Sequence, residues 1–213
     1  MGSVGGLRLR SRHGSSISGS FSSTNHRGTS SSARCADPPA MGATRVPDVR
    51  PLRLTVDWRA NRGQPHIQMA LALFRLAGHA RSFRSVPGRL VAVCLAAAYR
   101  GYALSVTSID VPTRTVIGPR LVVRHGFGLV VHADAVIGAD VVLRQGVTVG
   151  ALVGSHGAPR IGDRTEVGSG SQLIGAITIG EDVKIGAGAV VVRDIPAGRT
   201  AVGNPARLLG DAA

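Results

Sequence analysis

The sequence is short of aromatic residues, cysteine, lysine and acidic residues, and each shortage narrows what the chain can be. Phe, Trp and Tyr make up only 3% of the 213 residues, whereas hydrophobic residues reach 44%. A core with so few rings must be narrow and filled by Ile, Val, Leu and Ala. Two cysteines, Cys35 and Cys94, cannot form a disulfide framework, so we expect unpaired thiols and a cytoplasmic protein.

Acidic residues are half as frequent as basic ones, with 12 Asp and Glu against 25 Lys and Arg and a formal net charge of +13. Such an excess can indicate nucleic-acid binding. The basic residues form no stripe, however, and no aromatic platform for base stacking accompanies them, so we expect no nucleic-acid partner. An anionic small ligand, such as a nucleotide-bearing cofactor, fits this charge better.

What the sequence has in abundance is a six-residue repeat. Neither the helical period of 3.6 residues nor the strand period of 2 accounts for it. Glycine follows most of its aliphatic positions directly or one residue later. A short fixed period of this kind predicts a parallel β-helix, in which three units form one coil and stacked coils share a core. The aliphatic positions of the strict run are Ile161, Val167, Leu173, Ile179, Ile185 and Val191.

The composition divides the chain into four parts. Residues 1–50 are rich in Ser, Gly and Arg and predict a disordered tail, with the native start expected near Met41. Residues 51–108 predict an α-helical segment, residues 109–207 the β-helix, and residues 208–213 a short C-terminal tail.

Two helices are expected in the helical segment. Pro65 is well placed to begin the first, over residues 66–79, whose polar residues fall on one stripe of an otherwise apolar helix. After a break at Pro87-Gly88, the uncharged run Leu90–Tyr99 is about half as long as a bilayer span requires. We therefore expect this run to pack on a neighbouring helix or subunit, with association with a membrane surface as the less favoured alternative.

The six-residue period is broken at two places, and interruptions of a repeat often carry function. The first is a slip of two residues over 125–129, and the second is a loop over 150–160. His125 lies in the first break, and a neutral imidazole can remove a proton from an alcohol near pH 7. Asp110 precedes it by nearly one coil, so its carboxylate could fix the imidazole tautomer. Spacing alone leaves open that His125 is a corner residue and Asp110 a cap of the first coil.

Three stretches together resemble the hexapeptide-repeat acyltransferases over about residues 55–210: VIGPRLVVRHGFGLVVHADAVIGADVVLRQGVTVG, PRIGDRTEVGSGSQLIGAITIGEDVKIGAGAVVV and AVGNPAR. The HGxG bulge, the QGVTVG rung and the GNPA sequence resemble the serine acetyltransferase branch and its relatives, the colanic acid acetyltransferases, which acetylate exopolysaccharide sugars. This resemblance implies a left-handed parallel β-helix, a homotrimer, and acetyl-CoA as co-substrate in a groove between subunits. It also implies that His125 is the catalytic base, Asp110 its acidic partner, and that no acyl-enzyme forms.

The same resemblance assigns residues to acetyl-CoA. Ser169 and Ala187 match the small positions that touch its pantetheine arm, and Gly150 opens the flanking loop. Lys184, the only lysine in the chain, matches a basic position near the CoA phosphates; a solvated corner charge is an equal alternative.

The chain departs from serine acetyltransferases at the positions that hold serine. Gly157 and Ala158 replace an Arg-His pair for the carboxylate, and Arg124 replaces an Asp for the ammonium group. Each lost contact should cost about 1.5–3 kcal/mol of serine binding. Arg124 and His156 are therefore candidate acceptor-binding residues, and the expected acceptor is a sugar of an exopolysaccharide precursor. Serine O-acetylation in cysteine biosynthesis is the alternative.

Two other interpretations of the sequence compete with acetyl transfer. His125, His132 and His156 could form a zinc site, but their spacing does not match the β-helix family that builds one, so we expect no metal. The chain could also be a scaffold or binding module that keeps the coils without the activity. The intact His125 bulge and the GNPA sequence favour the enzyme.

Overall fold

The computed structural model describes residues 56–152 and 157–210. The predicted tail of residues 1–50, the expected start near Met41, Cys35 and His156 lie outside the described residues. After a segment of turns over residues 56–63 come the helices α1 (Pro65–Ala80) and α2 (Val86–Tyr102), and a π-helical turn over Ala103–Thr107 continues α2.

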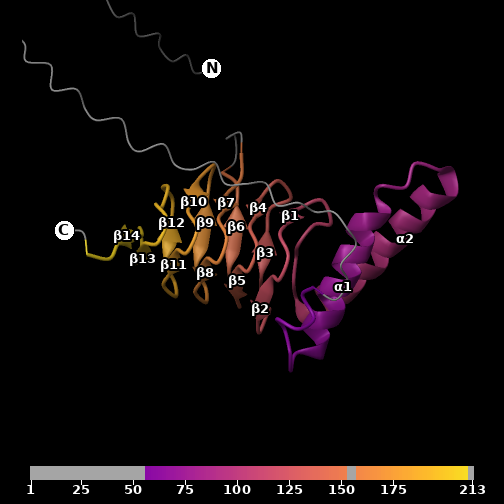
Figure 1. Ribbon diagram of the computed structural model, residues 1–213, viewed down its shortest axis with the longest axis horizontal. Coiled ribbons are helices and arrows are strands. Elements are labelled where there is room, and N and C mark those ends of the chain that lie inside the picture. Colours follow the sequence, from indigo (N-terminus) through magenta and orange to yellow (C-terminus); the bar gives the residue numbers. More distant parts are fainter. Residues whose placement is uncertain (1–55, 153–156, 211–213) are drawn as a thin grey trace, which may run out of the picture. The chain divides into compact units, whose positions relative to one another are not determined.

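Short strands then follow one another through the rest of the described chain (Figure 1). They are β1 (Val116–Ile117), β2 (Val122–Arg124), β3 (Val130–Val131), β4 (Val136–Ile137), β5 (Val142–Arg144), β6 (Thr148–Gly150), β7 (Arg160–Ile161), β8 (Glu166–Val167), β9 (Gln172–Ile174), β10 (Thr178–Ile179), β11 (Lys184–Ile185), β12 (Val190–Val191), β13 (Thr200–Val202) and β14 (Arg207–Leu208).

The strands form three sheets, because each strand pairs with the one that lies one coil further along the chain. One sheet has the order β1-β4-β7-β10, the second β14-β13-β11-β8-β5-β2, and the third β12-β9-β6-β3. All pairs are parallel except β13 with β14, which closes the last coil. The predicted fold class, a mainly β parallel β-helix preceded by helices, is confirmed.

The two predicted breaks of the period appear as coils of different length. Arg160 pairs with Thr178, so a regular coil advances by 18 residues. Val116 pairs with Val136 and Val136 with Arg160, so these two coils advance by 20 and 24. Val130 pairs with Thr148, again 18 residues, which places the two extra residues before β3 and the six extra residues after β6. Both insertions leave the core ladder in register.

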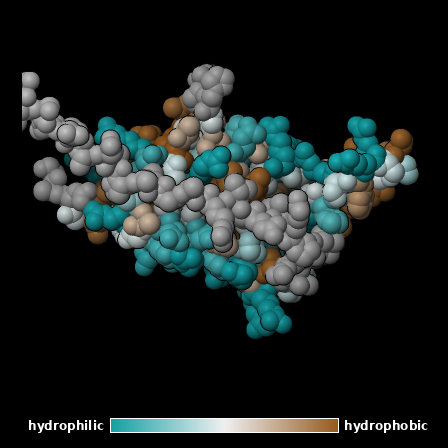
Figure 2. All heavy atoms as spheres, turned by 45° about the horizontal axis from the view of Figure 1, so that its top comes forward, coloured by the Kyte–Doolittle hydropathy of each residue, from teal (hydrophilic) through white to brown (hydrophobic). Residues whose placement is uncertain are grey.

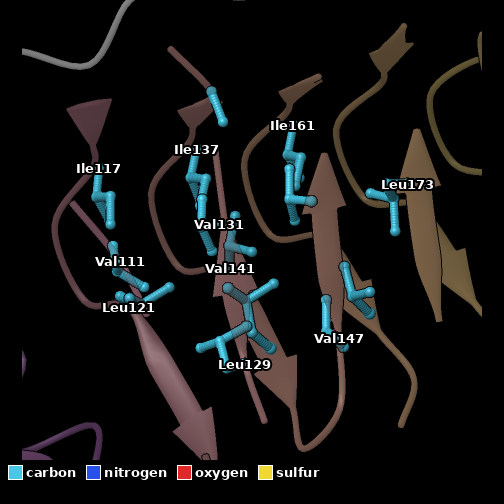
Figure 3. Close-up of a cluster of buried hydrophobic side chains, with 14 of the residues drawn as sticks. Val111, Ile117, Leu121, Leu129, Val131, Ile137, Val141, Val147, Ile161 and Leu173 are labelled. Atoms are coloured by element: carbon cyan, nitrogen blue, oxygen red, sulfur yellow. The ribbon is translucent and has the colours of Figure 1, made fainter. Parts of the chain in front are cut away.

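The core is one aliphatic column through the centre of the coils (Figure 3). Ile117, Ile137, Ile161 and Ile179 stack on one face and are at most 2% exposed. Thr165, one of the small residues of the repeat, is also fully buried, and its hydroxyl donates to the carbonyl oxygen of Gly180 at 2.9 Å. Each coil thus has inward positions in addition to the aliphatic ones that reveal the period.

The predicted polar stripe of α1 faces the protein: Gln68 is only 8% exposed, and Arg75 donates to the carbonyl oxygens of Ile117 and Gly118. The expected break at Pro87-Gly88 is wrong. The helix α2 already begins at Val86, and Pro87 occupies its first turn, where no backbone N–H is required. With the π-helical turn the helix covers Val86–Thr107, 22 residues, and by length and composition alone it could cross a membrane. The shorter run seen in the sequence therefore underestimates the helix.

Glycine is required where the backbone of one coil touches the next. A Cβ on Gly162 would lie 2.6 Å from the backbone nitrogen of Glu181, and Gly118, Gly138 and Gly180 have equally close backbone neighbours in the following coil. These glycines follow Ile117, Ile137, Ile161 and Ile179, so the Ile-Gly pairs of the repeat are steric requirements of coil stacking.

We predict that Gly162→Ala lowers the free energy of unfolding by about 1–3 kcal/mol, the usual cost of overpacking against atoms that cannot move aside. Urea unfolding followed by circular dichroism measures the change. Gly101→Ala is the matched control, because an added Cβ meets no atom within 4 Å there, and alanine should stabilise the exposed helix by about 0.5–1 kcal/mol. Equal effects of the two substitutions would contradict the steric explanation.

Candidate active site

His125 lies in the two-residue insertion at the corner between β2 and β3. Its φ is +64° and the next residue, Gly126, has φ +51°, so two successive residues adopt the left-handed conformation. The backbone nitrogen of Phe127 donates to the carbonyl oxygen of His125 at 2.6 Å. The tight turn puts His125 outside the regular ladder, with its side chain exposed.

A polar face of the segment before α1 holds this strand and the bulge. The Asp57 carboxylate accepts a hydrogen bond from the backbone nitrogen of Leu121 at 2.9 Å. The side chain of Asn61 accepts from the nitrogen of Val123 and donates to the carbonyl oxygen of Leu121, at 2.9 and 2.8 Å.

Gln64 completes the row, because its side-chain oxygen accepts from the backbone nitrogen of His125 at 3.1 Å. Asp57, Asn61 and Gln64 thus replace the neighbouring strand that β2 lacks at its open edge.

The other two faces of the first coil are closed in the same way. Arg75 pairs with the buried carboxylate of Asp57 at 2.9 Å and donates to the carbonyl oxygens of Ile117 and Gly118. The hydroxyl of Tyr99 donates to the carbonyl oxygen of Val111 at 2.8 Å, and burial raises the pKa of this phenol far above its usual range. An uncapped strand edge would leave backbone groups unpaired, so these side chains are part of the fold.

Sequence reasoning missed these capping residues. The strand partners of Asp57, Asn61, Gln64 and Arg75 lie 42 to 64 residues away in the chain, and no local pattern connects them; Tyr99 and Val111 are 12 residues apart. The one available signal is the spacing of Asp57, Asn61 and Gln64, which places three hydrogen-bonding side chains on one side of a helical turn.

Asp110 stands next to the bulge in the fold. It forms an isolated bridge with Val130, and its backbone nitrogen donates to the carbonyl oxygen of Leu129 at 2.8 Å. The neighbouring Ile109 packs on the bulge, because a Cβ on Gly126 would lie 2.9 Å from the Ile109 side chain. The segments of the predicted pair are therefore adjacent.

The Asp110 carboxylate itself is paired with a different residue. It lies 3.5 Å from the guanidinium of Arg100. In the described part of the chain no hydrogen bond joins it to the imidazole of His125. Beside it is a hollow of about 330 Å³ whose lining includes three arginines, Arg81, Arg100 and Arg114.

Ser169 and Ala187 lie in one column along the same corner of the β-helix as His125. The column is built by backbone hydrogen bonds one coil apart, from Gly146 to Phe127, from Gly170 to Gln145 and from Gly188 to Ser169, at 2.8 to 2.9 Å. Successive coils are about 4.8 Å apart, so the column extends for roughly 14 Å from the bulge to the coil of Ala187.

The other two predicted cofactor residues lie elsewhere on the chain. Lys184 is exposed in β11, between Glu166 and Thr200 of the adjacent coils. Gly150 is the last residue of β6 and pairs with Ile174, at the end of the strand that is remote from the Ser169 corner. Within one chain the structure does not bring Gly150 together with the column.

Two exposed arginines flank the bulge. Arg124 ends β2 directly before His125 and pairs in register with Arg144 at the end of β5, one coil away. Neighbouring like charges on one sheet face repel each other. Among the residues that the structure describes, neither guanidinium has an acidic partner, so the two charges can attract an anion.

Histidines and carboxylates do not converge on a metal site in the described ranges, where no group of three or more His, Cys, Asp or Glu could hold an ion. The His132 imidazole instead accepts from the backbone nitrogen of Asp134 at 3.2 Å. The candidate ligand His156 lies outside these ranges.

The repeated coils with a histidine bulge define a hexapeptide-repeat transferase, and comparisons with known proteins support this class. Residues 158–193 match the family of bacterial transferase hexapeptide (six repeats). The chain is 39% identical over 144 residues to serine acetyltransferase of Helicobacter pylori, a match that covers 66% of this chain and 79% of that protein. The chain therefore belongs to the serine acetyltransferase family of hexapeptide-repeat transferases.

Other relatives are longer. The chain is 49% identical over 105 residues to chloroplastic serine acetyltransferase 1 of Arabidopsis thaliana, but this match covers only 33% of that protein. The chain is 38% identical over 118 residues to serine acetyltransferase of Mycobacterium tuberculosis, a match that covers 54% of this chain and 52% of that protein. The chain thus matches from about a third to about a half of these two relatives.

Solved structures agree with the fold. Soybean serine acetyltransferase complexed with serine superimposes with a TM-score of 0.62 at 33% identity, over 73% of this chain and 68% of that one. Serine acetyltransferase of Brucella abortus strain S19 in complex with coenzyme A gives 0.63 at 28% identity, over 75% and 67%. The predicted resemblance is confirmed at the level of the serine acetyltransferase family, whereas its colanic acid branch finds no support here.

Proposed function

We propose that the chain is an acetyl-CoA-dependent O-acetyltransferase with His125 as the general base. The observation that carries this proposal is the bulge of His125, the only residue of the described coils that combines a titratable imidazole with a two-residue insertion. The bulge lies at the end of the Ser169–Ala187 column. The solved relatives in complex with coenzyme A and with serine support acetyl-CoA and serine as the two candidate substrates.

The exposed imidazole can approach an acceptor hydroxyl and take its proton. The hydroxyl oxygen then attacks the thioester carbonyl carbon, a C–O bond forms, the C–S bond breaks, and the CoA thiolate receives a proton. The Ser169–Ala187 column lies along the route that the pantetheine arm needs to bring the thioester to the bulge, and Lys184 can meet the phosphates. Because Gly150 lies at the far end of β6, a groove between two subunits of a homotrimer is the arrangement that would let it contribute.

Asp110 can orient the imidazole only if its carboxylate turns from Arg100 towards His125. Both partners of that ion pair are about half exposed, at 59% and 42%. Exposed ion pairs contribute at most about 1 kcal/mol, so substrate binding can break it. The role of Asp110 is therefore compatible with the geometry.

Serine is the acceptor that we favour, and the expectation of an exopolysaccharide sugar is replaced. The named relatives are serine acetyltransferases, including the one complexed with serine. The departures at Gly157 and Ala158 removed a carboxylate contact, but Arg124 and Arg144 place two unpaired guanidinium groups beside His125, and guanidinium groups bind carboxylates well. A sugar hydroxyl remains the second candidate, since Gly157 and Ala158 carry no group that could hold an amino acid.

His125→Ala should lower kcat by at least about 100-fold, because a positioned general base contributes 10²–10⁴ in rate. Release of the CoA thiol from acetyl-CoA measures this rate, and calorimetry should show unchanged acetyl-CoA binding. His132→Ala, which alters a half-buried histidine away from the bulge, should leave the rate unchanged. A His125→Ala protein with near-full rate would refute the assigned role, and absence of acetyl-CoA binding by the parent would favour a scaffold.

Gln64→Ala should lower kcat by roughly tenfold with little change in the KM for acetyl-CoA, because a bulge released from Gln64 holds the imidazole less well. Gln64→Glu keeps an acceptor oxygen for the His125 nitrogen and should retain most of the rate. Gln172→Ala, an exposed glutamine on β9, is the matched control. If Gln64→Glu is as slow as Gln64→Ala, the hydrogen bond to the bulge is not the cause.

Arg124→Gln and Arg144→Gln should each raise the KM for serine by about tenfold, since a hydrogen bond to a charged group contributes about 1.5–3 kcal/mol. The KM for acetyl-CoA should stay constant. Arg193→Gln, beyond the end of β12, serves as the control. An acceptor panel of serine, homoserine, neutral sugars and nucleotide sugars decides between the candidates: turnover of sugars without turnover of serine would overturn the serine assignment.

A further inference from the structure

The outer side of α2 carries an apolar face that the protein itself does not cover. Val86, Leu90 and Val93 are 81%, 66% and 65% exposed. Their spacing of four and three residues places them on one side of the helix. In Figure 2, hydrophobic and hydrophilic residues lie side by side at the end of the molecule formed by the helices. Over its 18-residue apolar window, α2 and its π-helical extension are only 17% buried, so this is not a core helix.

The charge around this face has one sign. No acidic residue occurs between Asp57 and Asp110, whereas residues 110–210 hold eight acidic residues against nine arginines and Lys184. The positive charge of the described chain is therefore concentrated on its helical end. The seven arginines between the two aspartates are Arg59, Arg62, Arg75, Arg81, Arg84, Arg89 and Arg100. Arg75 and Arg100 pair with Asp57 and Asp110, so the excess positive charge comes from the other five.

Apolar and cationic side chains meet at the turn between α1 and α2. Phe83 is 43% exposed there, next to Val86, and Arg81, Arg84 and Arg89 are exposed around them. Exposed apolar side chains surrounded by arginines suit the boundary between lipid headgroups and acyl chains. There the apolar side chains can insert among the acyl chains, and the guanidinium groups can contact anionic headgroups.

We propose that the α1–α2 turn and the outer face of α2 dock on an anionic lipid surface, with α2 lying in the plane of the interface. Charge selects this occupant over a second copy of the hairpin. Two identical faces without an acidic residue would bring arginines against arginines, and such like-charge contacts are unfavourable.

The length of α2 would permit a transmembrane span, but its contacts exclude one in this fold. Tyr99 packs edge-on against Phe74 of α1, with ring centroids 5.6 Å apart, and donates to Val111 of the first coil. Ala103 and Thr107 are 1% exposed at the junction with the β-helix. The inner side of α2 is thus fixed to the protein, and only the outer side is free to enter a membrane surface.

Co-sedimentation of the full chain with lipid vesicles tests the proposal. We expect binding to vesicles that contain phosphatidylglycerol, much weaker binding to pure phosphatidylcholine, and loss of binding at high salt. Val86→Asn/Leu90→Asn should weaken the binding to phosphatidylglycerol vesicles at least tenfold, because it removes two apolar side chains from the interface. Arg84→Gln and Arg89→Gln should weaken it by roughly fivefold each, the factor that corresponds to about 1 kcal/mol per arginine.

Matched controls lie on the β-helix. Val192→Asn, at a valine that is 47% exposed, and Arg193→Gln should bind like the parent. Binding by the hairpin variants equal to that of the parent would overturn the proposal and assign the affinity to another part of the chain.

A lower oligomeric mass of Val86→Asn/Leu90→Asn in light scattering would also overturn it, because a second copy would then cover the face. Thiol release from acetyl-CoA without vesicles should stay unchanged in every hairpin variant. If neither the parent nor any variant releases thiol from acetyl-CoA, while the parent still binds the vesicles, only the proposed enzymatic function fails.

Discussion

The open edge of the first coil is the constraint on which the rest of the structure depends. A β-helix satisfies its backbone by stacking, so its first coil has no partner below and must obtain one from another part of the chain. Here Asp57, Asn61 and Gln64 supply acceptors at the spacing of alternate strand residues, and the Arg75 guanidinium supplies donors for the adjacent face. Side chains of a helical segment thus act as a substitute strand.

This substitution links the fold to the chemistry. The row of capping bonds that begins at Leu121 and Val123 ends at the backbone of His125, so the interaction that closes the β-helix also holds the candidate base. Because the inserted residues follow that strand directly, the coils above them keep their register and the core stays continuous. The insertion gives His125 and Gly126 left-handed backbone conformations, so the chain leaves the regular ladder at this corner.

The sequence predicted the β-helix and the location of both insertions, because a six-residue period and its breaks are local patterns. It predicted His125 and Asp110 as neighbours for the same reason, since a coil has a nearly constant length. It could not predict that the Asp110 carboxylate lies 3.5 Å from Arg100, because that contact depends on how α2 meets the first coil. The capping role of Asp57 and Asn61 was hidden as well, since their strand partners lie 60 to 64 residues along the chain.

The start of α2 could not be predicted from the local sequence. Pro87 and Gly88 are strong signals for a helix end, yet here they occupy the first turn, where Ser85 caps the helix through its hydroxyl. Over its full length, α2 has a buried inner side and an exposed outer side. The inner side, with Tyr99 and Ala103 buried, fixes the helix to α1 and the first coil, and the capping of that coil is then complete. The apolar residues of the outer side take no part in that capping. A surface outside this chain would account for their apolar character.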